Sequence, residues 1–316
     1  SVKKRFSVTE VFSVHQKKIG FFSVLAKEEQ EVFVEKMKQA DFVLYLDASP
    51  YFKQKNSQIE KTIQEVYDLT KLPVLYANAW GLYNQGKQVF CMEGTSLLIN
   101  KAGEKIFESP MYEKYTLDFC SLEFKVSSHL ATSFSSVSSI EGIYLSVKYA
   151  IQAYAQLVGI KRVVIGVSGG IDSAVAAAMY VAALGREAVC LVNMPSRYNS
   201  KKTIHLSDTL AENLGTYYTT VSIEESVAIT KQQIEGLLAK SSKEGEILFH
   251  LSDIAKENIQ ARDRSARVLA AIAAAWQAVF TNNGNKTETT VGYSTLYGDT
   301  SGFFAVLADL WKYEVY

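Results

Sequence analysis

The chain has 316 residues, of which 48% are apolar and 21% charged, and its 33 basic side chains balance its 33 acidic ones. This apolar content excludes an intrinsically disordered chain. The zero net charge disfavours nucleic acid or an anionic membrane as partner, because both are normally met by an excess of Lys and Arg. A single hydrophobic core stops growing at roughly 250 to 300 residues, so the length predicts two domains.

The sequence indicates neither a membrane span nor a structural metal. Its longest apolar stretch, residues 268–280, contains Gln277 and is shorter than the roughly 18 residues that cross a bilayer. The first residues, SVKKRFSVTE, lack the features of a secretory signal, so we expect a cytoplasmic protein. The three cysteines, Cys91, Cys120 and Cys190, are too far apart for a disulfide framework or a Cys-x-x-Cys site, and the histidines are scattered.

Strand-like runs alternate with amphipathic, charged stretches between residues 19 and 100. The runs IGFFSVL, FVLYLD, PVLYAN and SLLIN are rich in aromatic and β-branched residues. Between two of them, apolar residues recur at three- and four-residue steps at Ile59, Ile63, Val66 and Leu69, which predicts a helix. The alternation predicts a layered α/β domain over residues 1–126.

A composition change marks the domain boundary. Residues 127–139 read SSHLATSFSSVSS, a serine-rich segment that can bury little and is typical of a linker. The second domain, 140–316, opens with a helical stripe from Ile140 to Val158. The segments RVVIGV, SAVAAAMYVAALG and EAVCLVN then follow as strand, helix and strand, with Gly185 as the expected C-cap. This βαβ unit predicts a doubly wound parallel sheet.

Two segments have glycines at the spacing of a phosphate-binding loop. The first, GLYNQGK at residues 81–87, matches a Walker A loop, but Gln88 replaces the Ser or Thr that would hold Mg²⁺. A strand-like run follows it, where phosphate binding would require the N-terminus of a helix. We therefore interpret the first segment as a turn between strands.

The second segment, VVIGVSGGIDS, lies where a buried strand ends and a helix begins. Gly169 and Gly170 allow a tight bend whose backbone N–H groups can converge on an anion, and Ser168 and Ser173 add hydroxyl donors. Asp172 would repel a bound phosphate unless a cation lay between them. The segment therefore predicts a phosphate site with Mg²⁺.

SGGIDS resembles the signature of the ATP pyrophosphatase family, adenine nucleotide alpha hydrolase-like proteins that cleave ATP between its α- and β-phosphates and adenylate a substrate. Further segments, in this order, resemble the glutamine-dependent branch of the NAD synthetase family. They are MPSRYNS (194–200), ENIQAR (257–262), which we expect to open an Ala-rich helix, TNNGNKTE (281–288), GYSTLYGD (292–299) and DLWK (309–312).

The resemblance implies an ATP- and Mg²⁺-dependent ligase that amidates deamido-NAD to NAD and releases AMP and pyrophosphate. An unactivated carboxylate resists ammonia because its carbon is electron-rich and its leaving group would be oxide. Conversion to an acyl adenylate removes this barrier. The ligands implied are ATP, Mg²⁺, deamido-NAD, and ammonia or glutamine as nitrogen source.

The resemblance also implies roles for individual residues. Asp172 and Glu288 would coordinate Mg²⁺, and Lys312 would contact the triphosphate. Asp299 would accept a proton from the incoming ammonium. The implied catalytic residues are therefore Asp172, Asp299 and Lys312.

The implied ligand contacts form two sets. Asn258, Arg262 and Glu288 would bind deamido-NAD. The set expected to bind ATP comprises Gly166, Val167, Ser168, Gly169, Gly170, Ile171, Asp172, Ser173, Thr281, Asn283 and Lys312. The family usually has Thr five residues before the Glu, where this chain has Asn283, with Thr281 nearby. Which of the two contacts ATP is left open.

The first domain also contains segments that resemble a known domain. LDASPY (46–51), YANAWG (76–81) and EGTS (93–96) resemble the later part of the nitrilase-like glutaminase domain that is fused to glutamine-dependent NAD synthetases. That domain uses a Cys nucleophile in a Cys-Glu-Asp segment. Alignment of VHQKKIGFFSVLAKEE places Val24, Leu25 and Ala26 there, and Cys91 is expected to be packed within a strand.

We therefore expect the chain to use free ammonia, or ammonia made by another subunit, with a structural first domain. The upstream half of the glutaminase domain and the helices that follow Lys312 in the family are absent, so we expect a fragment or a sequence with missing residues. The expected fold is a partial nitrilase-like α/β sandwich followed by a doubly wound parallel sheet.

The remaining expectations concern self-association of the chain and two alternative functions. The apolar helices expected over 140–158 and 267–280 predict a homodimer or larger homo-oligomer. Another pyrophosphatase-type adenylating ligase, such as a tRNA-modifying enzyme, is disfavoured by the neutral charge. An inactive nucleotide-binding scaffold is disfavoured because the chain retains Asp172, Glu288, Asp299 and Lys312.

Overall fold

The computed structural model describes residues 10–14, 17–22, 30–86, 88–113, 137–196 and 200–316. The chain divides into two compact units, Ser1–Ala150 and Ile151–Tyr316, and the division falls within helix α3 (Ser139–Val158). Residues 127–136 of the expected linker lie outside the described residues. The helix α3 begins at the last residue of that segment, close to the predicted start.

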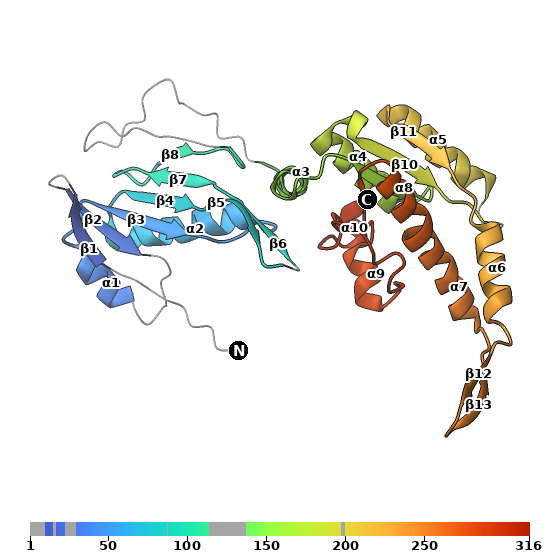
Figure 1. Ribbon diagram of the computed structural model, residues 1–316. Helices are drawn as coiled ribbons and strands as arrows, with labels where there is room; N and C mark the ends of the chain where they lie inside the picture. Colours follow the sequence, from blue (N-terminus) through green and yellow to red (C-terminus); the bar gives the residue numbers. More distant parts are fainter. Residues whose placement is uncertain (1–9, 15–16, 23–29, 87, 114–136, 197–199) are drawn as a thin grey trace. The chain divides into compact units, whose positions relative to one another are not determined.

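The first unit is built on a mixed six-stranded sheet (Figure 1). Strands β2, β3 and β4 run parallel, and the outer strands pair antiparallel. In sheet order the strands are β1 (Glu10–Val14), β2 (Lys17–Phe22), β3 (Phe42–Asp47), β4 (Val74–Asn78), β7 (Ser96–Ile99) and β8 (Lys105–Glu108). Alternate residues of β4, including Val74 and Tyr76, are buried, as expected for a sheet with one face on a core.

Helices α1 (Gln30–Met37) and α2 (Lys55–Thr70) supply the rest of this core. Ile63 and Val66 of α2 are buried, whereas Leu69 is 38% exposed. The C-terminal end of the predicted apolar stripe is therefore not part of the core. The described residues of the GLYNQGK segment, 81–86, lie in a separate antiparallel hairpin of β5 (Trp80–Asn84) and β6 (Val89–Glu93). Residues 81–84 belong to β5 itself, and Gln85 and Gly86 follow it, so the expected turn is shorter than the segment.

A buried ion pair lies at the start of α2. The Lys55 ammonium is 2.6 Å from a Glu93 carboxylate oxygen, and both side chains are at most 1% exposed. The same ammonium donates to the Ser49 carbonyl at 2.6 Å. Asn78, at the carboxyl end of β4, donates to Glu93 at 3.0 Å. These bonds satisfy the charges that burial would otherwise leave unpaired.

The second unit contains a four-stranded sheet in the order β11-β10-β9-β14, with every neighbouring pair parallel. The strands are β9 (Val163–Val167), β10 (Val189–Asn193), β11 (Tyr217–Thr220) and β14 (Val279–Phe280). The chain adds β10 and β11 on one side of β9 and then returns to place β14 on the other side. The strand order therefore reverses between β9 and β14, which makes a topological switch point.

The described residues of this unit also form the helices α4 (Ile171–Leu184), α5 (Lys201–Leu214), α6 (Glu224–Ile234), α7 (Asp253–Arg262), α8 (Ala270–Ala275), α9 (Lys286–Val291) and α10 (Lys312–Val315). A π-helical segment, Asp263–Leu269, joins α7 to α8, and Figure 1 shows the three as one long helix. A short 3-10 helix, Arg186–Ala188, follows Gly185, the expected C-cap of α4. The hairpin of β12 (Leu238–Ser241) and β13 (Gly245–Leu248) connects α6 to α7.

Two predicted helix boundaries are wrong. The ENIQAR segment does not open a helix, because α7 already begins at Asp253, where Ser252 caps it by accepting the Ala255 N–H at 3.2 Å. The helix expected over 267–280 ends at Ala275, and Val279 and Phe280 form β14. Pairing with β9 accounts for the second error, because tertiary hydrogen bonds determine the conformation of two residues that an apolar pattern cannot assign.

No helix in the described part of the chain combines the length and the apolar character needed to cross a membrane.

We predict that Lys55→Met lowers the free energy of unfolding by about 3–5 kcal/mol, because it leaves the Glu93 carboxylate buried and unpaired. Urea unfolding measures the change. The control is Lys71→Met, since the Lys71–Asp68 pair is more than half exposed on both sides and should contribute at most about 1 kcal/mol. Equal losses in the two variants would contradict the stabilising role of the buried pair.

We also predict that Gly169→Ala destabilises the second unit more than Gly159→Ala. Both glycines have a positive φ, +79° and +75°, which costs an alanine about 1–2 kcal/mol. A Cβ at Gly169 would also lie 2.5 Å from the Thr203 carbonyl oxygen, whereas nothing lies within 4 Å at Gly159. Overpacking should add about 1–3 kcal/mol at Gly169 alone. Thermal unfolding that shows equal losses would contradict this close approach.

Candidate functional site

The glycine turn connects the carboxyl end of β9 to the N-terminus of α4. The Ser168 N–H donates to the Ser173 hydroxyl at 3.3 Å, which donates in turn to the Gly170 carbonyl at 3.1 Å. Gly170 is the N-cap residue of α4 and has no side chain that could cap the helix. The first N–H groups of α4 can therefore serve an anion, as the sequence predicts.

The segment after β14 reaches the same turn from the neighbouring strand. Thr281 is buried, and its N–H donates to the Val164 carbonyl of β9 at 3.1 Å. Its hydroxyl donates to Asn283 Oδ1 at 3.0 Å, and Asn283 Nδ2 donates to the Gly166 carbonyl at 3.0 Å. Thr281 and Asn283 therefore form one hydrogen-bonded unit beside the turn, so both of the expected ATP contacts lie at the same place.

Asp172 is the charged centre of this region. One of its carboxylate oxygens accepts the Asn285 side-chain N–H at 3.0 Å, and the other forms an ion pair with the Lys312 ammonium. The hydrogen bond and charge of Asp172 raise the pKa of Lys312 above its ordinary value, and Glu288 contributes in the same direction. The structure thus brings Asp172, Glu288 and Lys312 together from α4, α9 and α10.

A second cluster lies between α7 and the loop that follows α9. Thr295 donates from its hydroxyl to Asn258 Oδ1 at 2.8 Å and from its N–H to Asp299 Oδ1 at 2.6 Å. Arg262 Nε donates to the Leu296 carbonyl at 3.1 Å. The structure therefore places Asn258, Arg262 and Asp299 around one loop, although they are up to 41 positions apart along the chain.

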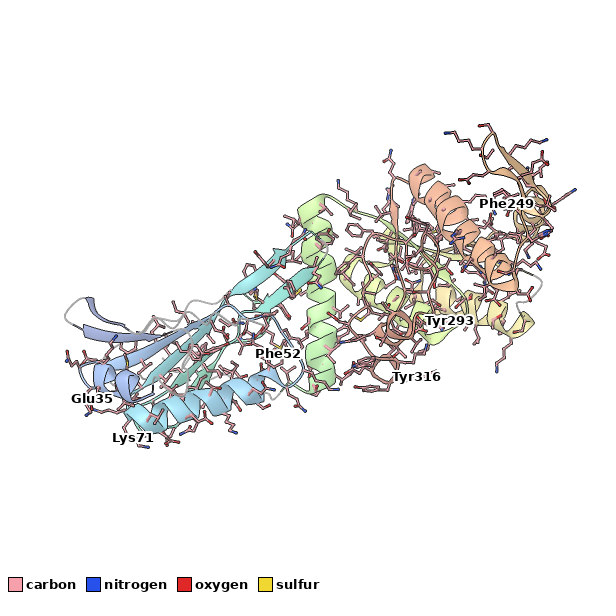
Figure 2. All side chains as sticks on the ribbon, turned by 90° about the horizontal axis from the view of Figure 1, so that it is seen from below. Glu35, Phe52, Lys71, Phe249, Tyr293 and Tyr316 are labelled. Carbon is pink, nitrogen blue, oxygen red and sulfur yellow. The ribbon has the colours of Figure 1, made fainter. Side chains whose placement is uncertain are left out.

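Aromatic side chains of this loop are open to solvent. Tyr293 and Tyr297 are each 76% exposed, and Tyr293 is labelled in Figure 2. Tyr297 has a φ of +63°, in the left-handed region that non-glycine residues rarely occupy. Such strain is commonly stored at functional sites.

Only part of the MPSRYNS segment can be placed, because residues 197–199 lie outside the described residues. Met194 is buried at the end of β10, and its carbonyl accepts a hydrogen bond from Arg264 Nε at 3.3 Å. Burial lowers the pKa of Arg264. Arg264 lies in the π-helical segment, a type of irregularity that is frequent at functional sites.

Two carboxylates, Asp172 and Glu288, are the candidates for holding a metal ion in the described part of the site. Among the residues that the structure describes, no group of three or more His, Cys, Asp or Glu side chains could enclose a metal ion. Mg²⁺ on a nucleotide is usually held by one or two carboxylates together with phosphate oxygens. The oxygen donors Asp172 and Glu288 fit that kind of ion, and they do not fit a structural zinc ion.

Cys91 is the one cysteine in the described part of the first unit. Residues 24–26, where the family resemblance would place one, lie outside the described residues. Cys91 lies in β6, and burial raises the pKa of its thiol to about 11. A thiol with this pKa is protonated at neutral pH and is a poor nucleophile. This agrees with the prediction that Cys91 is packed within a strand.

Two residues of these clusters, Asn285 and Thr295, were not among the site residues expected from the sequence. Asn285 is fully buried and caps α9 in a capping box with Glu288. The pattern Asn-x-x-Glu before a helix was a detectable signal for the cap. No sequence signal indicated that Asn285 also contacts Asp172, since the two are 113 positions apart.

The chain matches known proteins along most of its length. A family model described as NAD synthase matches residues 143–316. The glutamine-dependent NAD(+) synthetase of Synechocystis is 32% identical over 280 residues, covering 87% of this chain and 47% of that protein. The protein of the same name from Rhodobacter capsulatus is 33% identical, with 88% and 48% covered. The chain thus spans about half the length of the curated relatives it matches.

Two solved structures share the fold. The glutamine-dependent NAD⁺ synthetase of Acinetobacter baumannii in complex with ADP has a TM-score of 0.82 at 29% identity, covering 99% of this chain and 57% of that chain. The glutamine-dependent NAD(+) synthetase of Cytophaga hutchinsonii has a TM-score of 0.74 at 20% identity, with 99% and 58% covered. The first match confirms the expected fold class. With the family model covering more than half of its residues, the chain belongs to the NAD synthase family.

Proposed function

We propose that the second unit catalyses the ATP-dependent amidation of deamido-NAD to NAD through an acyl adenylate, with release of AMP and pyrophosphate. The observation that carries this proposal is the cluster of Asp172, Glu288 and Lys312 beside an open helix N-terminus at the switch point of the sheet. Support comes from the relatives named glutamine-dependent NAD(+) synthetase and from the ADP bound to the A. baumannii protein.

The β9–α4 turn would bind the phosphates of ATP. Its backbone N–H groups and the N-terminus of α4 favour negative charge. Lys312, which contacts Asp172, has the flexible four-carbon stem of a lysine and would turn its ammonium group to a phosphate oxygen. Thr281 and Asn283 fix the Gly166 carbonyl and thereby the start of the turn.

Asp172 and Glu288 would hold Mg²⁺, which when bound neutralises phosphate charge and makes pyrophosphate a better leaving group. Both carboxylates are fixed before any ligand arrives, because each is hydrogen-bonded to Asn285. Such preorganisation lowers the cost of reorganising charge during the reaction.

The cluster around Thr295 would bind deamido-NAD and handle the ammonium proton. Asn258 and Arg262 offer amide and guanidinium donors on one face of α7. Asp299 is exposed and is held by the Thr295 N–H, so its free carboxylate oxygen can accept a proton from ammonium. The released ammonia would then attack the adenylated carboxyl carbon and displace AMP.

Ammonia is the proposed nitrogen source. In the described part of the first unit, Cys91 is the one cysteine, and its raised pKa opposes a nucleophilic role. Conversion of glutamine would therefore need a nucleophile other than Cys91, from outside the described part of the first unit.

We predict that the purified chain, given ATP, Mg²⁺ and deamido-NAD, forms NAD and AMP with ammonium and forms neither with glutamine. Mass spectrometry of separate ammonium and glutamine reactions measures both products. Cys91→Ser should leave the ammonium rate unchanged, because a protonated, partly buried thiol of the first unit takes no part in it. NAD formed from glutamine at a matching rate would contradict the proposed nitrogen source, and no NAD from ammonium would contradict the proposed reaction.

In the same assay, Asp172→Asn should lower kcat with ammonium more than about 100-fold, since it removes the central charge of the phosphate site. The matched control is Asp253→Asn on α7, whose side chain is 97% exposed and which should retain full activity. An inactive nucleotide-binding scaffold would instead show no turnover in either variant or in the wild type, so the wild-type rate separates the two functions.

We further propose that the chain forms a homodimer or larger homo-oligomer. Leu157 and Val158, near the end of α3, are 65% and 45% exposed, which leaves apolar surface that a second copy could cover. Light scattering of the purified chain should give at least twice the monomer mass of 35.1 kDa. A single species at the monomer mass would contradict this proposal.

A further inference from the structure

We propose that Asn285 is a positioning residue that sets both carboxylates of the proposed Mg²⁺ site. This inference rests on the proposed function, because it assigns Asn285 a role in metal-dependent ATP binding. Capping α9 is the simpler explanation for a buried Asn at this position, and the contacts of its side chain distinguish between the two roles.

Asn285 holds the two carboxylates with different groups, the Asp172 carboxylate with its side-chain amide and the Glu288 carboxylate with its backbone N–H. Asn285 Nδ2 donates to Asp172 Oδ1 at 3.0 Å, and Asn285 Oδ1 accepts the Glu288 N–H at 3.0 Å. The Asn285 N–H donates to Glu288 Oε2 at 3.2 Å, so the Glu288 side chain is held as well. Two elements that are distant in sequence, α4 and α9, are therefore joined through a single residue.

The orientation of the amide follows from its neighbours. A backbone N–H requires an acceptor, and the Asp172 carboxylate requires a donor, so Oδ1 must face Glu288 and Nδ2 must face Asp172. Burial strengthens this requirement, because Asn285 is 0% exposed and an unsatisfied amide group there would cost about 1–3 kcal/mol. The geometry is thus fixed by hydrogen bonding on both sides.

Capping alone does not require asparagine. Ser, Thr and Asp are comparable N-cap residues, since each offers an oxygen to the helix N–H groups. Ser and Thr are too short to reach Asp172 as well, and Asp would place a second negative charge against it. Among the good capping residues, Asn alone combines the cap with a long neutral donor.

The second carboxylate oxygen of Asp172, Oδ2, has a different partner, which shows why the Asn285 donor on Oδ1 matters. Lys312 occupies Oδ2, and the proposed function requires Lys312 to turn to the phosphates when ATP binds. The Asn285 bond to Oδ1 does not depend on that movement. It would keep the Asp172 carboxylate in one orientation while its cationic partner leaves.

The test compares the affinity for ATP in EDTA with the affinity in Mg²⁺, each measured by equilibrium dialysis on the full chain. The ratio of the two dissociation constants gives the gain from the metal. Asn285→Ser retains a cap oxygen and removes the donor to Asp172, and we expect the ratio to fall about 10- to 100-fold, as for other residues that orient metal ligands. The affinity in EDTA should change little.

Asn285→Thr is a second variant that fills more of the buried space, in case Asn285→Ser fails to fold. Ser252→Ala is the control for helix capping, because it removes the N-cap of α7 and should lower the melting temperature with no change in the ratio. An unchanged ratio in folded Asn285→Ser or Asn285→Thr would overturn the inference. A wild-type chain whose ATP affinity does not increase with Mg²⁺ would also overturn it.

This binding measurement is independent of turnover. A wild-type chain that makes no NAD, yet gains ATP affinity from Mg²⁺ and loses that gain in Asn285→Ser, would refute the proposed reaction and support the positioning role. Turnover by the wild type together with an unchanged ratio in Asn285→Ser would support the reaction and refute the positioning role.

Discussion

The pairing of β14 with β9 is the constraint on which the site depends. Two residues of β14 lie parallel to β9, and the Thr281 N–H extends the ladder to Val164. Because parallel strands end at the same edge of a sheet, this short pairing brings residues 281–288 beside the glycine turn. Neither segment would form the site alone, since the turn supplies N–H groups and Asp172, whereas the second segment supplies Asn285 and Glu288.

A carboxylate at the proposed phosphate site would repel a phosphate group, and Asp172 has a polar partner on each of its carboxylate oxygens. Lys312 provides a full positive charge on one side and Asn285 a neutral donor on the other. Lys312 can be exchanged for a different cation without disturbing the neutral donor. This arrangement suits a site that binds a highly charged ligand in one state and is free of it in another.

The sequence predicted the turn well because strand, glycine pair and helix are adjacent in the chain, and local sterics determine their conformation. It also named Asn258, Arg262 and Asp299 as candidate site residues, through resemblance to a family. It could not place their contacts, which depend on how α7 packs against the loop after α9. The end of α8 and the hydrogen bond between Asn285 and Asp172 were not predicted either. Both depend on contacts between residues that are more than a hundred positions apart in the sequence.

In the first unit, alternation of strand-like runs and helices predicted the main elements correctly, including β3, β4 and α2. The buried Lys55–Glu93 pair gave no signal, because Lys at the start of an amphipathic helix is usually exposed. Burial of that pair depends on the hairpin of β5 and β6, whose position relative to α2 is a tertiary property.

The central claim is that the deamido-NAD carboxylate is activated as an adenylate, and an isotope experiment tests it most directly. Deamido-NAD labelled with ¹⁸O at both carboxylate oxygens is incubated with the chain, ATP, Mg²⁺ and ammonium. Mass spectrometry then measures the masses of the AMP and NAD formed. The account predicts AMP carrying one ¹⁸O and NAD retaining the other, because ammonia displaces AMP together with one carboxylate oxygen. AMP of natural mass, or ADP in place of AMP, would contradict it.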